Sequence, residues 1–352
     1  MARLNLFLTE IKFMKNSKKY NKILISGYYG FDNFGDESIL QTLVTKLKTQ
    51  NNKITVLSSN PQKTSEYYDV SSVYSFDMFK VFANILKCDT FISGGGSLLQ
   101  DTTSFKSLAY YLILLNLALF FGKKVVIFAQ GLGPFRNKLG ALWVKHTLKR
   151  CSYISVRDKK SQFLLKKWGI NSELVCDPFF DIPLPTPQPQ GIVGIQLRKT
   201  KTLNINYLKE LARFVAQNFK DKKLELYSFQ ESLDLKICEQ FREFLNENGA
   251  DAQIISQKTP YEMIERISKL DYMIAMRFHA VLTSVRLGIR TLAVSYDMKV
   301  EKIAREFNIP CLQMKSSDDF TEAFQRLRGV DSKSLVKLSE EKSFNWDKVL
   351  TQ

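Results

Sequence analysis

Short apolar segments alternate with amphipathic segments along the first half of the chain. The apolar segments are typical of buried strands and cover residues 22–27, 54–57, 90–93, 125–129, 153–156 and 174–175. Helix-like runs separate most of them, beginning with the amphipathic run 37–48 that follows a glycine-rich turn. Strands that alternate with helices predict a parallel sheet of the doubly wound kind.

The same alternation returns in the second half. Expected strands cover residues 192–196, 224–228, 252–255, 272–275 and 291–295. The expected helices cover residues 207–218, 233–247, 260–269, 279–287 and 299–307, and the chain after residue 318 also reads as helical. Between the halves, residues 181–190 contain four prolines, which continue neither a helix nor a central strand.

These patterns predict an α/β fold of two doubly wound, Rossmann-like domains. The expected parts are a basic N-terminal extension (1–21), a first domain (22–182), an extended proline-rich linker (183–190), a second domain (191–330) and a helical C-terminal tail (331–352). Two such domains joined by a short linker suggest the glycosyltransferase-B (GT-B) arrangement. A ligand cleft would then lie between the carboxyl ends of two facing sheets.

Residues 108–121 form the longest apolar run of the chain. The run is too short to span a bilayer, which takes about 20 residues. It favours a buried helix that covers the sheet. A helix that dips into the membrane interface is the alternative, and the basic charge of the first half keeps it open.

The net charge of +16 is uneven, because residues 1–185 carry 25 Lys and Arg against 13 Asp and Glu. Such a surplus suits nucleic acid, an anionic membrane surface or phosphorylated substrates. No nucleic-acid motif supports the first of these, so no nucleic-acid partner is expected.

The cysteines and histidines predict no metal site. Five cysteines stand without CxxC spacing, as expected for reduced thiols of a cytosolic protein, and the two histidines are far apart. Residues 1–22 contain five lysines but no long apolar core, so no signal peptide is expected. The chain is therefore expected to be cytoplasmic, with peripheral attachment to the inner face of the cytoplasmic membrane allowed by its charge.

Glycine-rich turns follow three of the expected strands. In the first turn, Gly30 permits a tight turn, while Asn33 and Asp36 could hold sugar hydroxyls; Asp36 could equally cap the following helix. In the second turn, three successive glycines could expose N–H groups to an anion or could allow close packing of strand and helix; they are Gly94, Gly95 and Gly96. The third turn begins at Gln130.

Basic residues and a histidine also stand at strand ends. Arg157 could grip a carboxylate or a phosphate, or pair with Asp158. Arg277 and Lys299 follow consecutive strands of the second half. In an extended chain, Arg277 and His279 would point to one side, towards one anionic substrate. His279 suits proton transfer, with a structural histidine as the alternative, whereas His146 reads as a surface residue.

In their order and spacing, several segments resemble the polysaccharide pyruvyl transferases, and the bacterial CsaB type above all. They are GYYGFDNFGDESIL, GGGSLLQD, QGLGPF, SVRDKKS, DPFFD, RFHAVL and YDMKV, within residues 22 to about 315. The resemblance implies transfer of the enolpyruvyl carbons of phosphoenolpyruvate to a sugar as a ketal, with release of phosphate. For the CsaB type it implies a lipid-diphosphate-linked, N-acetylmannosamine-containing acceptor and a secondary cell wall polymer as the end product.

The resemblance also implies roles for single residues. His279 would be catalytic, and the donor phosphoenolpyruvate would be bound by Arg157, Arg277 and Lys299. The acceptor or phosphate would be bound in the first domain by Gly30, Asn33, Asp36, Gly94, Gly95, Gly96 and Gln130. Met298 departs from the proline that the family usually has before this lysine. Phosphoenolpyruvate is a co-substrate here, and no cofactor is expected.

Two other functions remain open from the sequence. A GT-B glycosyltransferase would need an acidic residue for the ribose of a nucleotide sugar, and Glu301 is available. A non-catalytic glycan- or lipid-binding protein is the other alternative. The presence of Arg157, Arg277 and His279 argues against it.

Overall fold

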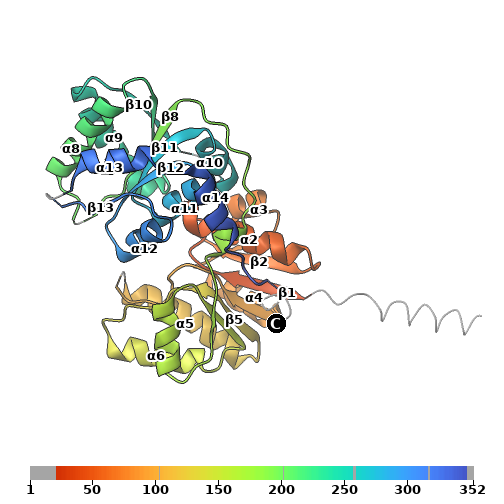
Figure 1. The fold of residues 1–352 in the computed structure, drawn as a ribbon. Coiled ribbons are helices and arrows are strands. Elements are labelled where there is room, and N and C mark those ends of the chain that lie inside the picture. The colour runs from red at the N-terminus through yellow and green to blue at the C-terminus, as the bar shows by residue number, and fades with distance from the viewer. Residues whose placement is uncertain (1–20, 103, 201, 257–258, 316–317, 347–352) are drawn as a thin grey trace, which may run out of the picture. The chain divides into compact units, whose positions relative to one another are not determined.

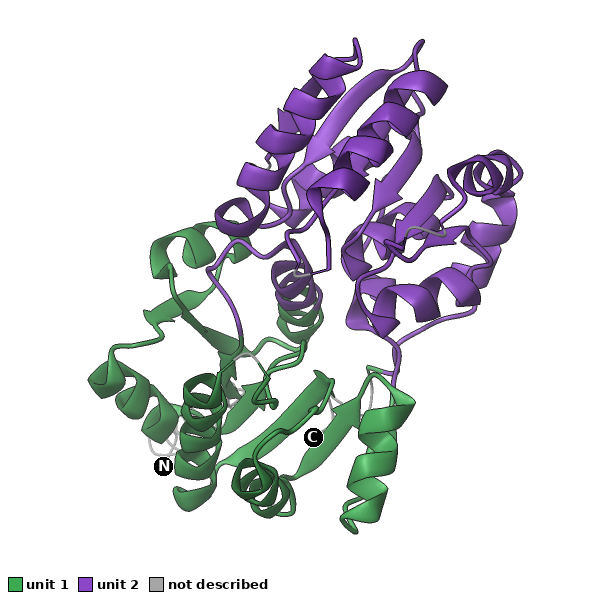
Figure 2. Ribbon diagram, turned by 90° about the vertical axis from the view of Figure 1, so that its left-hand side faces the viewer, with its two compact units in different colours: residues 1–27, 43–174, 346–352 green, residues 28–42, 175–345 purple. Residues whose placement is uncertain are grey.

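The structure, a computed structural model, describes residues 21–346 except 103, 201, 257–258 and 316–317. The predicted N-terminal extension, apart from residue 21, and residues 347–352 of the predicted tail lie outside this part. The chain groups into two compact units, coloured separately in Figure 2: unit 1 takes 1–27, 43–174 and 346–352, and unit 2 takes 28–42 and 175–345.

Unit 1 is built on a parallel sheet of seven described strands in the order β3-β2-β1-β4-β5-β6-β7. The strands are β1 (Lys22–Ser26), β2 (Lys53–Ser58), β3 (Ser71–Tyr74), β4 (Thr90–Ser93), β5 (Lys124–Gln130), β6 (Tyr153–Val156) and β7 (Glu173–Leu174). The connecting helices are α3 (Pro61–Tyr68), α4 (Met78–Lys87), α5 (Phe105–Phe120), α6 (Lys138–Leu148) and α7 (Lys159–Lys167). The strand order reverses direction between β1 and β4, which makes the sheet doubly wound.

Unit 2 repeats this plan with six described parallel strands in the order β10-β9-β8-β11-β12-β13. The strands are β8 (Ile192–Gln196), β9 (Lys223–Tyr227), β10 (Ala252–Ile255), β11 (Leu270–Ala275), β12 (Arg290–Val294) and β13 (Cys311–Leu312). The helices are η1 (Pro178–Asp181), α8 (Ile205–Asn218), α9 (Glu231–Glu247), α10 (Pro260–Ile267), α11 (Phe278–Arg286), α12 (Met298–Glu306), α13 (Phe320–Arg328) and α14 (Ser332–Glu340). Here the order reverses between β8 and β11.

Alternating side chains of the second sheet feed two apolar layers. Met273 and Ala275 of β11 pack with residues of α10, α11, α12 and α14. Ile274 of the same strand packs with residues of α8, α9 and α13, and Figure 1 shows these helices around the labelled strands. A strand buried on both faces reads as a continuous apolar run, which is why the sequence pattern located β11.

The predicted α/β class with two doubly wound sheets is confirmed, and most predicted elements end within a few residues of the observed ones. β3, α3, α4 and β13 were not predicted. The run 108–121 is a buried helix: α5 buries Leu108, Leu112 and Leu115. Within the described residues, no helix has the length and apolarity that crossing a bilayer requires.

Helix α2 (Phe34–Lys48) begins in unit 2 and ends in unit 1, so residues 28–42 group away from the rest of the predicted first domain. The proline-rich segment groups with unit 2, where the N–H groups of Gln188 and Gln190 donate to the carbonyls of Ser268 and Lys269. The predicted domain boundaries and the cleft between the domains stay predictions. The tail contains α14, and its described residues 341–346 are not helical.

Gly194 of β8 offers a test of the packing in unit 2. A Cβ atom at this position would lie 2.5 Å from Cδ1 of Leu270 and 2.9 Å from the sulfur of Met273. Gly194→Ala should therefore lower the free energy of unfolding by about 1–3 kcal/mol, measured by urea denaturation. Gly329→Ala is the control, because its Cβ would meet its nearest neighbour at 3.5 Å. Equal stability of the two variants would contradict the packing described.

Candidate functional site

The candidate site of unit 2 lies where β8 and β11 end side by side. In a doubly wound sheet, ligands bind outside the carboxyl ends of the strands at the point where the strand order reverses. Gln196 ends β8 and pairs in register with Ala275 of β11. The residues that follow these strands, Arg198 and Arg277, therefore stand at the position where such sheets bind ligands.

A buried carboxylate organises this edge of the sheet. Asp234, in the first turn of α9, accepts hydrogen bonds from Nε and Nη2 of Arg277 at 2.9 and 2.6 Å. The N–H groups of Phe229 and Gln230 donate to the same carboxylate at 3.0 and 3.1 Å. Asp234 is fully buried and Arg277 is 7% exposed. This bidentate pair was not predicted, and it commits part of a predicted donor-binding guanidinium to a structural partner.

Arg277 is the N-cap residue of α11, and the helix starts at Phe278. The expectation of an extended Arg277-Phe278-His279 segment is therefore wrong, because the chain turns into the helix directly after Arg277. The backbone N–H of Arg277 donates to Oε1 of Gln196 at 2.8 Å, which ties the helix start to the end of β8. His279 then lies in the first turn of α11, where helical N–H groups favour anions.

His279 lies between a carboxylate and a glycine. Its Nε2 is 3.7 Å from Oδ1 of Asp177, and the two groups form an ion pair only when the imidazole is protonated. Its side chain is 16% exposed, and Nε2 is buried beyond hydrogen-bonding distance of any described partner. The ring packs near the rings of Phe179 and Phe278, with centroids 5.7 and 5.1 Å away. Asp177 belongs to the DPFFD motif, but no role was predicted for it.

Helix α2 brings the glycine to this histidine. A Cβ atom on Gly35 would lie 2.2 Å from Nδ1 of His279, so only glycine fits the observed approach. The helix start is held in unit 2 by Phe34, whose N–H donates to the carbonyl of Phe229 at 2.9 Å and whose ring packs 4.4 Å from that of Phe229. The signal for this approach in the sequence was Gly35 itself, within the first glycine-rich motif.

The other predicted residues of the first turn take structural contacts within unit 2. Gly30 has φ +78° and donates its N–H to Glu37 at 2.7 Å. The Asn33 side chain accepts from Gly35 N–H at 3.1 Å and donates to Gln230 at 3.3 Å, so Asn33 caps α2. Asp36 lies in the first turn of the helix and is partly exposed, and the alternative in which it caps α2 is wrong.

Two further basic residues lie at this edge of unit 2. Arg198, which follows β8, donates to the hydroxyl of Tyr296 at 3.0 Å and lies 5.4 Å from the centre of its ring. Burial raises the pKa of Tyr296, so the phenol remains a neutral partner at neutral pH. Lys299 lies exposed in the first turn of α12, which Asp297 caps. Sequence reasoning missed Arg198, although it follows a strand just as Arg157 does.

In unit 1, the predicted glycines and Gln130 come together at the carboxyl ends of β4 and β5. Nε2 of Gln130 donates to Oγ of Ser93 and to the carbonyl of Gly94, each at 2.7 Å. The N–H of Gly94 donates to Ser26 at 2.7 Å, and Gly94, Gly95 and Gly96 are all buried. The expectation of an exposed N–H loop is therefore wrong for Gly94, and the close-packing alternative describes it.

Arg157 lies beside this cluster, at the end of β6. Its N–H donates to the Gln130 carbonyl at 3.3 Å, and Nη2 donates to Oγ of Ser97 at 3.3 Å. Asp158 caps α7 by accepting from the N–H and the hydroxyl of Ser161 at 2.8 and 2.7 Å. Unit 1 thus unites Arg157, Gln130 and the glycine loop, whereas in unit 2 Arg277 and His279 follow β11 and Lys299 lies in the helix that follows β12. Their roles in binding and catalysis stay predictions.

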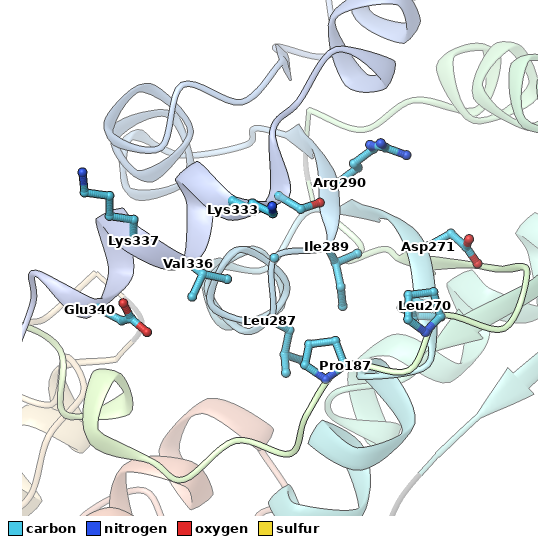
Figure 3. A pocket seen from close by; sticks show the side chains of 13 residues that line it. Pro187, Leu270, Asp271, Leu287, Ile289, Arg290, Lys333, Val336, Lys337 and Glu340 are labelled. Carbon is cyan, nitrogen blue, oxygen red and sulfur yellow. The ribbon is translucent and has the colours of Figure 1, made fainter.

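A cavity of about 490 Å³ lies at the opposite, amino edge of the second sheet (Figure 3). Leu270 and Arg290 line it from the starts of β11 and β12, and Val336 and Lys337 line it from α14. None of its lining residues is a predicted site residue, and this edge is not where doubly wound sheets bind ligands. We therefore do not assign it to the candidate site.

Comparisons with known proteins give a family and a fold. Residues 33–298 match the family model described as polysaccharide pyruvyl transferase. No match is found among curated proteins. Similar solved structures include Anabaena Alr3699/HepE in complex with UDP and glucose, with a TM-score of 0.60, 11% identity and coverage of 95% of this chain and 98% of that one.

Two further structures agree in fold. UDP-GlcNAc 2-epimerase from Neisseria meningitidis bound to UDP-GlcNAc has a TM-score of 0.60 at 11% identity and covers 90% of this chain and 94% of its own. Spinosyn rhamnosyltransferase SpnG has a TM-score of 0.53 at 12% identity and covers 94% and 100%. At such identities the likeness concerns the fold alone, and it agrees with the predicted GT-B-like class.

The Arg277–Asp234 pair makes a prediction about stability. Arg277→Met would leave a carboxylate buried without its cation, so the free energy of unfolding should fall by about 3–5 kcal/mol in urea denaturation. Arg198→Met is the control, since its loss removes a ring contact and a hydrogen bond to a neutral phenol, the bond worth about 0.5–1.5 kcal/mol, and leaves no unpaired carboxylate. A variant at Arg277 as stable as the parent protein would refute the structural role of the pair.

The contact of Gly35 with His279 can be tested by NMR of the imidazole groups. Gly35→Ala should shift the ring signals of His279, because the new methyl group occupies the space of Nδ1. The signals of His146, on α6 in unit 1, should stay in place and serve as an internal control. Unchanged His279 signals would show that the ring does not lie against Gly35.

Proposed function

Because the chain belongs to the polysaccharide pyruvyl transferase family, whose model matches residues 33–298, we propose that it transfers pyruvate from phosphoenolpyruvate to a glycan as a ketal. The observation that carries this proposal is the position of His279, beside Asp177 at the reversal point of the second sheet, with two arginines on the adjacent strand ends. A titratable group beside several cations suits a substrate that has both a carboxylate and a phosphate.

The proposed reaction proceeds in two additions. A proton is added to the methylene carbon of phosphoenolpyruvate, and positive charge develops at the carbon that bears the phosphate. One acceptor hydroxyl attacks this carbon and loses its proton. A second hydroxyl then attacks the same carbon as the bond to phosphate breaks, gives its proton to the departing phosphate and closes the ketal ring, so inorganic phosphate and the ketal are the products. The chemistry needs no oxidant, reductant or further co-substrate.

We assign the proton transfers to His279, as general acid, general base or both in turn. Asp177 would orient the imidazole through its carboxylate, and Gly35 would fix the position of the ring by its close approach. We call these two positioning residues, because they act through the histidine.

Anion binding is assigned to the cations of the two units. In unit 2, Arg198 and Lys299 would bind the donor together with the three N–H groups of Arg277 that Asp234 does not accept from. Arg198 joins the set because its guanidinium donates to a neutral phenol rather than to a carboxylate. In unit 1, Arg157 remains a proposed binding residue for the donor substrate, phosphoenolpyruvate.

The acceptor is proposed from the resemblance to the CsaB type. A lipid-linked or polymeric glycan that contains N-acetylmannosamine would be modified on the route to a cell wall polysaccharide, at the cytoplasmic face of the membrane. Gly30, Asn33, Asp36, Gly94, Gly95, Gly96 and Gln130 remain the proposed acceptor or phosphate residues. The buried ones, Gln130 and the glycine loop, would act by shaping the backbone rather than through direct side-chain contact.

The test is an assay of phosphate release with phosphoenolpyruvate and a panel of N-acetylmannosamine-containing acceptors, with the pyruvylated product followed by mass spectrometry. His279→Gln should lower the rate by about 10²–10⁴-fold, the usual contribution of a general acid-base residue. His146→Gln is the matched control and should keep full activity. Unchanged turnover in His279→Gln would remove its catalytic role.

The alternatives differ in the same material. A nucleotide-sugar enzyme would bind a UDP-sugar in calorimetry and would release no phosphate from phosphoenolpyruvate, and Glu301→Gln would weaken that binding. A non-catalytic glycan-binding protein would bind the acceptor panel without turnover. Absence of phosphate release with every acceptor would refute the proposed pyruvyl transfer.

A further inference from the structure

Exposed aromatic side chains gather at one place in unit 1. We define the α4 face by six residues: Tyr74, Phe76, Phe79, Phe82, Leu86 and Phe120. Phe79 is 90% exposed and Phe120 is 76% exposed, and the other four lie between 40% and 55%. Large apolar side chains that are exposed together mark interaction surfaces, whereas single exposed ones are ordinary.

Ring contacts and one hydrogen bond join residues of this face to α5 in two places. Tyr74 and Phe76 have ring centroids 5.6 Å apart, and Phe76 lies 5.7 Å from Tyr110 of α5. In the middle of α4, Phe82 lies 5.4 Å from Phe121, whose ring is 5.1 Å from that of Phe120. Nζ of Lys123 donates to the carbonyl of Leu86 at 2.7 Å, which holds the end of α5 against the end of α4.

Helix α4 is apolar on two sides. Its inner side buries Val81 and Ile85. Its outer side carries Phe79, Phe82 and Leu86 at spacings of three and four residues, which places them in one stripe along the helix. Phe79 adds almost nothing to the core of unit 1, and Phe82 and Leu86 are only partly covered by it, so an external surface would bury what the core leaves exposed.

Three lysines lie near this stripe. Lys80 and Lys87 lie exposed on α4, and Lys123 lies at its end. Two carboxylates are close: Asp77 caps α4 and pairs with Lys80 at 3.0 Å, and Asp89 accepts from the backbone of Lys22 at 2.9 Å. Three lysines against two carboxylates leave a surplus of one positive charge, so the face combines aromatic rings with a small cationic excess.

We propose that the α4 face docks on an anionic lipid bilayer, with Phe79 and Phe120 inserted at the level of the headgroups. Aromatic rings beside lysines are the composition of interfacial helices, since the rings enter the boundary of headgroups and acyl chains while the lysines meet anionic lipids. A bilayer is favoured over a protein partner, because each of the two most exposed rings has a lysine close by: Phe79 shares α4 with Lys80 and Lys87, and Phe120 lies three residues before Lys123.

This proposal goes beyond the proposed enzymatic function and does not rest on it. It assigns membrane contact to α4 and the end of α5, whereas the apolar run that suggested such contact in the sequence is mostly core. Vesicle binding needs neither phosphoenolpyruvate nor an acceptor, so failure of the two proposals can be distinguished.

The experiment measures co-sedimentation of the full chain with vesicles of phosphatidylcholine, with and without phosphatidylglycerol. The parent protein should bind the anionic vesicles and dissociate at about 1 M salt, where the screening length falls to about 3 Å. Phe79→Ser should weaken the partition coefficient about tenfold or more, as expected for loss of an inserted phenyl ring. Lys87→Glu should weaken it about fivefold or more.

Matched controls come from unit 2. Tyr261 is 55% exposed, so Tyr261→Ser is the control for Phe79→Ser. Leu233 is 48% exposed and Leu86 is 43% exposed, so Leu233→Ser is the control for Leu86→Ser. Lys236→Glu controls for the charge change. Because all these side chains are exposed, the variants should keep the thermal unfolding of the parent, so loss of binding is not loss of fold.

Insertion itself can be read from fluorescence. Phe79→Trp should gain a blue-shifted emission on vesicles and be quenched by brominated lipid, whereas Tyr261→Trp should not change. Absent binding of the parent protein, or binding unaffected by both Phe79→Ser and Lys87→Glu, would overturn the proposal. So would sedimentation in which the parent is a dimer, Phe79→Ser is a monomer and neither binds vesicles, since the face would then join two copies of the chain.

Discussion

The buried carboxylate of Asp234 sets the geometry of the candidate site in unit 2. It accepts hydrogen bonds from Arg277, which follows β11, and from Phe229 and Gln230, which follow β9. Gln196 joins the same network through the backbone of Arg277. An unpaired buried charge is far more costly than a paired one, so the strand ends and the start of α11 are fixed together. His279 inherits its position from this arrangement, because it lies two residues beyond Arg277.

The histidine is held from further sides by segments that are distant in sequence. The 177–182 segment supplies Asp177, and Arg286 of α11 donates to the carbonyls of Phe179 and Ile182, which binds this segment to the same helix. Burial lowers the pKa of Arg286 to about 10, which still leaves it charged at neutral pH. Helix α2 adds Gly35 against the ring. The imidazole is thus fixed by α11, η1 and α2 together, as catalysis by a positioned group requires.

Sequence patterns located the repeating strands and helices because buried parallel strands read as apolar runs. They missed β3 and α3, since Ser71–Tyr74 is only partly buried and Pro61–Tyr68 is mostly polar. The motifs located His279, Arg277 and the glycine turns, which stand directly at strand ends. They missed Asp234, Arg198 and the contact of Gly35 with His279. Each of these depends on how β8, β9 and β11 are paired and on how α2 packs, and no local pattern encodes that.

Hydropathy along the chain and exposure in the fold rank the helices of unit 1 differently. The most apolar segment, α5, buries Leu108, Leu112 and Leu115, so most of its apolar side chains belong to the core. The shorter α4 buries Val81 and Ile85 and leaves a second apolar stripe partly exposed, with Phe79 exposed the most. A hydropathy average over a helix does not distinguish its buried stripe from its exposed stripe. Only the exposed stripe is available to a binding partner. For this reason the sequence alone does not show where on the first half a basic, membrane-binding surface would lie. The fold is needed to show which aromatic side chains lie beside the lysines.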